Sequence, residues 1–147
     1  MLKSRHRKMP AFSMSLTDEA ATEQLGAGLA ARLKPGDVVG LKGDLGTGKT
    51  TLARAIIRAA MNDPDLIVPS PTFTLVETYD TPLGPYWHFD LYRLETPEQV
   101  YELGWEEALA EGVVLVEWPE RLGALLPEHL SVTLEVEGDG RRALLDV

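Results

Sequence analysis

The sequence contains no cysteine, which excludes disulfide bonds, thiolate metal sites and cysteine nucleophiles. Its three histidines stand at positions 6, 88 and 129, too far apart to predict a histidine-rich zinc site. No apolar run approaches the ~18 residues that cross a bilayer, so a membrane protein is not expected. With no internal repeat and no low-complexity tract, the 147 residues correspond to one ordinary domain.

Basic residues are scarce, because 14 lysines and arginines stand against 23 acidic residues, a net charge of −9. Four of the 14 lie within the first eight residues, so the rest of the chain carries ten basic and 23 acidic side chains, a net charge of −13. A domain with this negative charge would repel the phosphate backbone of a nucleic acid. The charge therefore argues against a broad nucleic-acid-binding groove and favours a basic protein partner. We predict a disordered basic tail over residues 1–10 and a folded domain over residues 11–147. The basic tail is not expected to be a signal peptide, because no apolar stretch follows it.

The first half of the chain has the pattern of helix, strand, glycine-rich turn and helix. Leucines recur every four residues after Thr17, the expected N-cap, and predict a helix over 18–33. The apolar run 38–41 predicts a short buried strand, and residues 43–48 form a glycine-rich turn. The apolar spacing after this turn predicts a second helix.

The second half is rich in strand-forming residues. Residues 73–79 and 86–92 predict a hairpin, residues 113–116 a fully apolar strand, and residues 130–136 and 142–147 a second hairpin around Gly138-Asp139-Gly140. Taken together, the patterns predict an α/β fold: a single domain with a mixed β-sheet flanked by helices and with antiparallel hairpin additions.

The glycine-rich turn and the residues after it read Gly43-Asp44-Leu45-Gly46-Thr47-Gly48-Lys49-Thr50, which matches the phosphate-loop pattern G-x-x-x-x-G-K-[ST] without a mismatch. The turn lies between a predicted strand and a predicted helix, the context that such a loop requires. Backbone N–H groups of the loop and the positive end of the helix would bind the phosphates of a nucleotide. Lys49 would reach the β- and γ-phosphates, and Thr51 would lie at the α-phosphate. The hydroxyl of Thr50 would bind Mg²⁺. The expected phosphate-binding residues are Leu45, Gly46, Thr47, Gly48, Lys49, Thr50 and Thr51.

Hydrolysis also needs a carboxylate at the end of a buried strand, to hold Mg²⁺ or to orient water. Glu117 follows four apolar residues, as in a Walker B motif with Glu in place of Asp; the alternative is a solvated acid at a strand end. Asp90 comes late in an aromatic-rich strand, where a bare carboxylate is costly, and the alternative is an ion pair with Arg93. The pattern does not decide which carboxylate positions the attacking water.

Five further side chains have a functional and a structural interpretation. Thr72 follows Pro69-Ser70-Pro71, whose two prolines hold the chain extended; it could face the γ-phosphate as part of a switch, or could simply begin a strand. Trp118 could stack on the base or fill the core. For His88 a hydrogen-bonded strand residue is favoured over a proton-transfer role, and for Arg93 and Arg121 a surface or ion-pair position is favoured over stabilising the γ-phosphate.

Three classes of phosphate-loop protein differ in the further motifs that their function needs. The Asn/Thr-Lys-x-Asp motif of GTPases is absent. A small-molecule kinase normally has an arginine-bearing lid, and no lid segment stands out, but a kinase remains the alternative function. A nucleotide-binding interaction module, in which ATP orders a surface and hydrolysis resets it, is the third class.

Four segments, in this order, resemble the TsaE (YjeE) family of bacterial ATPases of tRNA threonylcarbamoyladenosine biosynthesis. They are Gly43 to Thr51, Ser70 to Glu77, His88 to Leu94, and Leu115 to Pro119. The resemblance covers most of residues 15–122 and includes neither the last hairpin nor the basic first eight residues. It implies a phosphate-loop (P-loop) NTPase-like domain over residues 11–147.

The resemblance implies a cytoplasmic, Mg²⁺-dependent ATPase, with ATP and ADP as its nucleotides. Its partner would be a transferase complex of two related sugar-kinase-like subunits, of TsaB and TsaD type, and it would meet tRNA only indirectly. That complex modifies the adenosine next to the anticodon in tRNAs that read codons beginning with A, and ATP hydrolysis would reset it. The sequence offers no convincing built-in arginine finger, so the protein alone is expected to hydrolyse ATP slowly.

Carried over by motif, Lys49 binds phosphates, Thr50 and Glu117 bind Mg²⁺, Asp90 supports hydrolysis, Thr72 lies in the switch segment and Trp118 lies near the nucleotide. The chain near Leu16 and Thr17 is expected to border the adenine. The expected catalytic residues are therefore Lys49, Thr72, Asp90 and Glu117.

Overall fold

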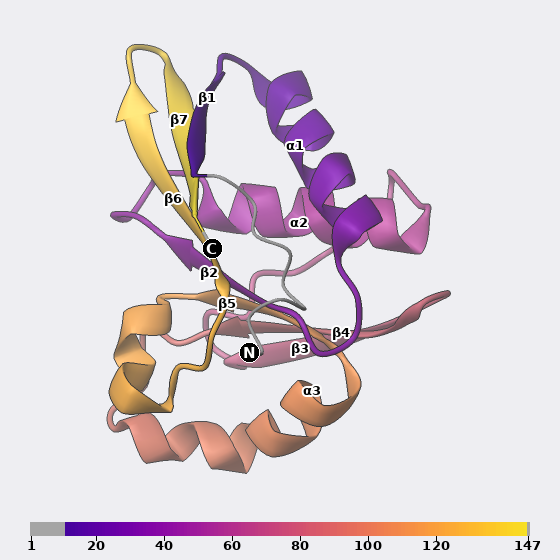
Figure 1. The fold of residues 1–147 in the computed structure, drawn as a ribbon, viewed down its shortest axis with the longest axis vertical. Helices are drawn as coiled ribbons and strands as arrows, with labels where there is room; N and C mark the ends of the chain where they lie inside the picture. The colour runs from indigo at the N-terminus through magenta and orange to yellow at the C-terminus, as the bar shows by residue number, and fades with distance from the viewer. Residues whose placement is uncertain (1–10, 147) are drawn as a thin grey trace.

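The structure, a computed structural model, describes residues 11–146; the predicted tail over residues 1–10 and the last residue lie outside this range. Figure 1 shows the fold. The elements in chain order are β1 (Phe12–Leu16), α1 (Glu19–Arg32), β2 (Val38–Lys42), α2 (Lys49–Met61), β3 (Val76–Thr81), β4 (Gly84–Asp90), the 3₁₀ helix η2 (Pro97–Leu103), α3 (Trp105–Glu111), β5 (Val113–Glu117), the 3₁₀ helix η3 (Pro119–Leu125), β6 (Leu130–Glu137) and β7 (Gly140–Asp146). No helix within residues 11–146 is long and apolar enough to cross a membrane.

The strands form one seven-stranded sheet in the order β1-β7-β6-β2-β5-β4-β3. The four middle strands are parallel, because β2 pairs with β5 and β6, and β5 pairs with β4, in parallel register. The hairpin partners β3 and β7, and β1 beside β7, run antiparallel to their neighbours. The predicted mixed α/β sheet with antiparallel hairpin additions is therefore confirmed.

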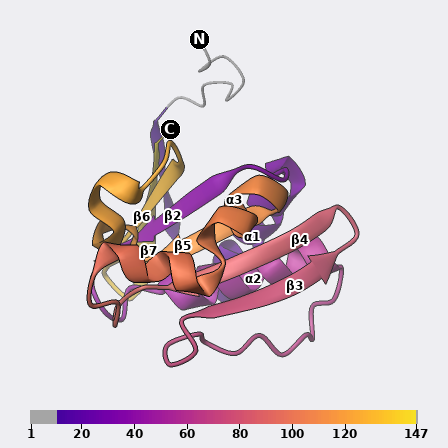
Figure 2. The ribbon, with the colours of Figure 1, turned by 90° about the horizontal axis from the view of Figure 1, so that it is seen from below.

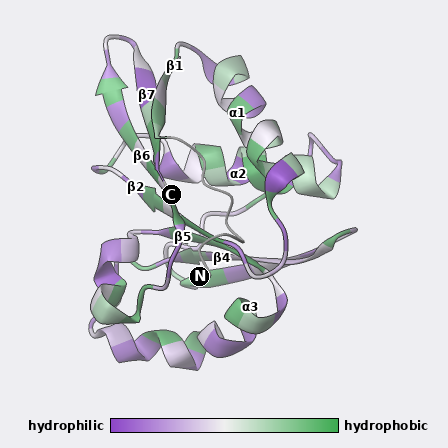
Figure 3. Ribbon diagram, in the orientation of Figure 1, coloured by the Kyte–Doolittle hydropathy of each residue, from purple (hydrophilic) through white to green (hydrophobic). Residues whose placement is uncertain are grey.

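The central strands bury both of their faces, as their unbroken apolar sequences predict. Val39 and Leu41 of β2 pack in the core under α1 and α2, whereas Val38 packs in a second core with Trp105 of α3. Figures 1 and 2 show α1 and α2 on one side of the sheet and α3 on the other. In Figure 3 hydrophobic residues dominate β2 and β5, while the helices alternate between hydrophobic and hydrophilic residues.

Two details of the prediction are wrong. Asp18, not Thr17, is the N-cap of α1, because Asp18 has extended backbone and its carboxylate accepts a hydrogen bond from the N–H of Ala21 at 2.9 Å. The strand predicted from residue 73 begins only at Val76, because the N–H of Leu75 closes a turn on the carbonyl oxygen of Pro71 at 2.7 Å and Leu75 takes a φ of 71°. The short edge strand β1 was not predicted.

Candidate active site

The buried polar side chains of residues 11–146 are concentrated at the phosphate loop and at the ends of two neighbouring strands. They are Thr47, Lys49, His88, Asp90 and Glu117, each 6% exposed or less. The loop follows β2, His88 and Asp90 are in the last part of β4, and Glu117 ends β5. Because these three strands are parallel neighbours, their carboxyl ends meet at one edge of the sheet, the usual place for a ligand in such folds.

The phosphate loop takes backbone conformations that favour glycine. Gly48, the N-cap of α2, has a φ of 100°, and a Cβ on Gly43 would lie 2.5 Å from the carbonyl oxygen of Leu134. The Nζ of Lys49 donates to the carbonyl oxygens of Gly43 and Asp44 at 2.7 and 2.8 Å. The lysine of the motif thus lies inside the curve of its own loop.

Lys49 is a buried cation among carboxylates. Burial lowers its pKa from the usual lysine value, and the negative charges of Glu117, Glu120, Asp90 and Asp44 oppose this shift. On one side its Nζ lies 4.3 Å from the centroid of the Trp118 ring, a cation–π contact. Trp118 itself is half-buried and packs against Tyr92, with 5.0 Å between the ring centroids.

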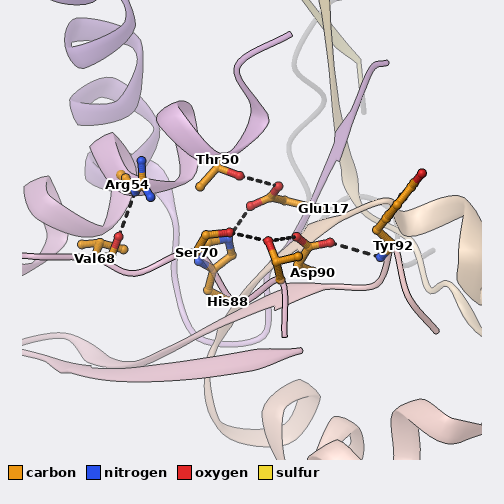
Figure 4. Close-up of polar contacts among 9 residues, drawn as sticks. Thr50, Arg54, Val68, Ser70, His88, Asp90, Tyr92 and Glu117 are labelled. Atoms are coloured by element: carbon orange, nitrogen blue, oxygen red, sulfur yellow. Dashed lines mark hydrogen bonds and ion pairs between the residues drawn. The ribbon is translucent and has the colours of Figure 1, made fainter. Parts of the chain in front are cut away.

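Both carboxylate oxygens of Glu117 are hydrogen-bonded, as Figure 4 shows. One oxygen accepts from the hydroxyl of Thr50 at 2.8 Å, and the other lies 2.7 Å from Nε2 of His88. His88 is fully buried, and its Nδ1 has no hydrogen-bond partner within the part of the chain that is described. The two residues expected to bind Mg²⁺ are therefore in direct contact.

Asp90 stands next to Glu117 in the register of β4 and β5 but has weaker partners. One oxygen accepts from the backbone N–H of Tyr92 at 3.1 Å, and the other from the hydroxyl of Thr72 at 3.4 Å, which in turn lies 2.7 Å from the hydroxyl of Ser70. Burial raises the pKa of Asp90; the negative charge of Glu117 adds to this, while the Tyr92 N–H opposes it. Figure 4 shows this chain of hydroxyl groups leading to the carboxylate.

Arg93 and Arg121 both lie over aromatic rings. The guanidinium of Arg93 lies 4.7 Å from the centroid of the Phe73 ring, and that of Arg121 lies 5.7 Å from the centroid of the Tyr92 ring. An ion pair between Arg93 and Asp90, the structural alternative for that carboxylate, is not among the ion pairs found within residues 11–146.

A cavity of about 240 Å³ adjoins the phosphate loop. Its walls are the junction of β1 and α1, the start of α2, and the turn between β6 and β7; the lining residues include Leu16, Thr17, Thr47, Gly48, Thr51 and Arg141. The structure thus places Thr17 and Thr51 together beside the loop. Arg141 was not predicted as a site residue, since nothing in a pair of arginines after a Gly-Asp-Gly turn indicates such a position.

The oxygen donors at this site fit magnesium. Mg²⁺ is commonly held by one or two protein carboxylates together with nucleotide phosphates and water, and Thr50 and Glu117 offer two adjacent oxygens at the mouth of the loop. A cluster of three or more His, Asp or Glu side chains able to hold a metal ion was not found within residues 11–146. The donor set fits an ion that is completed by the nucleotide.

A strand, a glycine loop, a lysine at the start of the next helix and an acid at the end of the adjacent parallel strand define a P-loop NTPase-like protein, a class that binds nucleotides. The sequence model of the family described as "Threonylcarbamoyl adenosine biosynthesis protein TsaE" matches residues 16–144. The chain belongs to the TsaE family.

Individual relatives agree with this assignment. The chain is 46% identical over 128 residues to the tRNA threonylcarbamoyladenosine biosynthesis protein TsaE of Rickettsia felis, covering 86% of this chain and 74% of that one. Its identity to the Bacillus subtilis protein of the same name is 39% over 117 residues, covering 78% and 72%. The crystal structure of Bacillus subtilis YdiB superposes with a TM-score of 0.76 at 29% identity, covering 92% of this chain and 84% of that one.

Proposed function

We propose that this protein is the ATP-binding and ATP-hydrolysing accessory subunit of the bacterial machinery that makes threonylcarbamoyladenosine next to the anticodon of tRNAs reading codons that begin with A. The observation that carries the ATPase proposal is the contact between Thr50 and Glu117 beside the buried Lys49 and Asp90. The biosynthetic assignment is supported by membership of the TsaE family and by the names of its relatives.

For nucleotide binding, the loop N–H groups from Leu45 to Gly48 and the start of α2 would hold the phosphates, with Thr51 at the α-phosphate. Lys49 would exchange its bonds to the loop carbonyl oxygens for the β- and γ-phosphates. Thr50 and Glu117 would hold Mg²⁺, which would neutralise the charge that develops on the phosphate oxygens. The cavity beside Leu16 and Thr17 would take the nucleoside.

For hydrolysis, we assign the attacking water to Asp90. The water oxygen forms a bond to the γ-phosphorus, the bond from that phosphorus to the β–γ bridging oxygen breaks, and ADP leaves with the electron pair. The water proton passes to Asp90 or to a phosphate oxygen. Glu117 is less suited to this role because both of its oxygens are already engaged, and Thr72 would orient Asp90 through its hydroxyl.

The proposed partners are the two sugar-kinase-like subunits of TsaB and TsaD type, and the proposed place of action is the cytoplasm. Arg93 and Arg121 lie over aromatic rings, and neither is paired with the buried carboxylates within residues 11–146. A partner would therefore supply the missing transition-state charge, and hydrolysis would reset the transferase complex. The net charge of −9 favours docking on protein over direct binding of tRNA.

The test is phosphate release from Mg-ATP by the purified protein, with and without the two partner subunits, and with Lys49→Ala as the blank. We expect a slow rate that the partners raise and that the Lys49→Ala variant loses. Fast hydrolysis by the protein alone would contradict partner activation. ATP consumption that requires a small phosphate acceptor would instead support the kinase alternative.

A further inference from the structure

Arg141, at the beginning of β7, holds two carbonyl oxygens of the phosphate loop. Its Nε donates to the carbonyl oxygen of Thr47 at 3.0 Å, and its Nη2 donates to that of Gly46, also at 3.0 Å. The third nitrogen, Nη1, donates to the carbonyl oxygen of Gly140 at 3.1 Å. One planar guanidinium therefore bridges two successive peptide groups of the loop, a geometry that a lysine could not reproduce.

The orientation of a carbonyl group fixes the orientation of the next N–H. The two groups of a trans peptide lie in one plane and point in opposite directions. By holding the carbonyl of Thr47, Arg141 directs the N–H of Gly48 away from itself, at the position that caps α2. By holding the carbonyl of Gly46, Arg141 also fixes the N–H of Thr47, which belongs to the same peptide group. That N–H donates to the carbonyl oxygen of Asp44 at 3.3 Å and closes a turn in the loop.

The backbone of Arg141 is itself held in the sheet. It pairs with Leu16 of β1 on one side and with Val136 of β6 on the other. Its side chain lines the cavity beside the loop together with the junction of β1 and α1. Arg141 thus stands where the C-terminal hairpin, the edge strand and the phosphate loop meet.

We propose that Arg141 is a positioning residue of the nucleotide site: from the C-terminal hairpin it sets the peptide planes of Gly46 and Thr47 so that the loop receives the β-phosphate without rearranging. This inference rests on the proposed nucleotide-binding function. It gives the antiparallel hairpin, an addition to the parallel core, a role in ligand binding. Arg141 would act through the loop backbone and would not itself carry out chemistry.

The matched control is Arg142, the next residue of the same strand. Successive side chains of a strand point to opposite faces, and Arg142 donates to Glu137 at 2.9 Å and to Ser13 at 3.0 Å instead of to the loop. Both substitutions, Arg141→Ala and Arg142→Ala, remove one arginine from β7 and change the net charge equally. A difference between them therefore reports on the loop contacts.

The experiment is calorimetric titration of wild type, Arg141→Ala, Arg141→Lys, Arg142→Ala and Lys49→Ala with Mg-ADP and with AMP, next to melting curves without nucleotide. Loss of two charge-assisted bonds should weaken ADP binding about tenfold or more in Arg141→Ala. The preference for ADP over AMP should shrink as well, because the loop acts on the β-phosphate. The ADP affinity of Arg141→Lys should lie between those of wild type and Arg141→Ala, and millimolar guanidinium should partly restore the ADP affinity of Arg141→Ala.

Each outcome decides the proposal. Equal ADP affinity in Arg141→Ala and wild type would overturn it. An equal loss of ADP and AMP affinity that follows the melting temperature, with no rescue by guanidinium, would assign Arg141 a merely structural role and also overturn it. If wild type fails to bind ADP, or binds it no better than Lys49→Ala does, the proposed function fails. If wild type binds ADP and Arg141→Ala binds it with the same affinity, only this inference fails.

Discussion

Glu117 gives the sharpest test of the site, because its carboxylate can be removed with or without its hydrogen bonds. Glu117→Gln keeps an acceptor for the Thr50 hydroxyl and an amide group beside Nε2 of His88. Glu117→Ala removes both contacts and leaves His88, which is fully buried, without its observed partner. The two variants therefore separate the charge that would bind Mg²⁺ from the packing of the strand end.

The magnitudes follow from the two bonds. A hydrogen bond to a charged group contributes about 1.5–3 kcal/mol, but removing a buried carboxylate also removes its desolvation cost, which offsets much of the loss. We expect Glu117→Ala to lower the free energy of unfolding by about 2 kcal/mol, roughly 4–8 °C in melting temperature for a chain of this size. We expect Glu117→Gln to lower it by less than about 1 kcal/mol, since the side chain keeps its shape.

Hydrolysis should respond differently from stability. Both variants would lose a carboxylate ligand of the proposed Mg²⁺ site, and a loss of about 3 kcal/mol of transition-state stabilisation corresponds to a rate reduced about a hundredfold. The assay is phosphate release at saturating Mg-ATP beside melting curves of the same samples, with Glu111→Gln, an exposed acid at the end of α3, as the control. Near-normal hydrolysis by Glu117→Gln, or rates that merely follow melting temperature, would refute the assignment.

Three further predictions concern the neighbouring groups. Burial raises the pKa of Asp90 in the folded state, so the ionised carboxylate lowers the stability of the fold at pH values above that pKa, and this cost disappears as the pH falls. Melting curves should therefore show Asp90→Asn more stable than wild type near pH 7 but not in acid. Phosphate release by wild type should fall as the pH drops through the raised pKa of Asp90. Gly48→Ala should lower the free energy of unfolding by about 1–2 kcal/mol in denaturant titrations, because Gly48 has a φ of 100°, and should weaken ADP binding in calorimetry. Binding of phosphates should draw Lys49 away from the Trp118 ring and change tryptophan fluorescence, and this change should be lost in Trp118→Phe and kept in Trp87→Phe.

The parts of the fold that were predicted correctly depend on local patterns. The apolar run of β5, the glycines of the loop and the turn of the last hairpin each determine their structure within a few residues. The errors arose where two local signals compete. Thr17 and Asp18 can both cap a helix, and Phe73 to Leu75 have strand-forming side chains although the backbone there forms a turn on Pro71.

The site was predictable only as far as its motifs extend. Lys49 and Thr50 follow from the loop pattern, and Glu117 and Asp90 from their places after strand-like runs, because ends of parallel strands share one edge. The contact between His88 and Glu117 and the bonds of Arg141 to the loop join residues 29 and 94 or 95 positions apart. No spacing rule connects such residues, since the order of strands in the sheet decides which of them meet.

The two carboxylates follow similar runs in the sequence, and their surroundings distinguish them. Glu117 is held by a hydroxyl and an imidazole at 2.8 and 2.7 Å, so it is fixed in place and its position suits a ligand. Asp90 is also buried, but its closest donor is a backbone N–H at 3.1 Å, and its pKa is raised. A carboxylate with a raised pKa and a loosely held oxygen is a better acceptor for the proton of water than one that is fully engaged. The hydrogen bonds therefore favour Glu117 for the metal and Asp90 for the water.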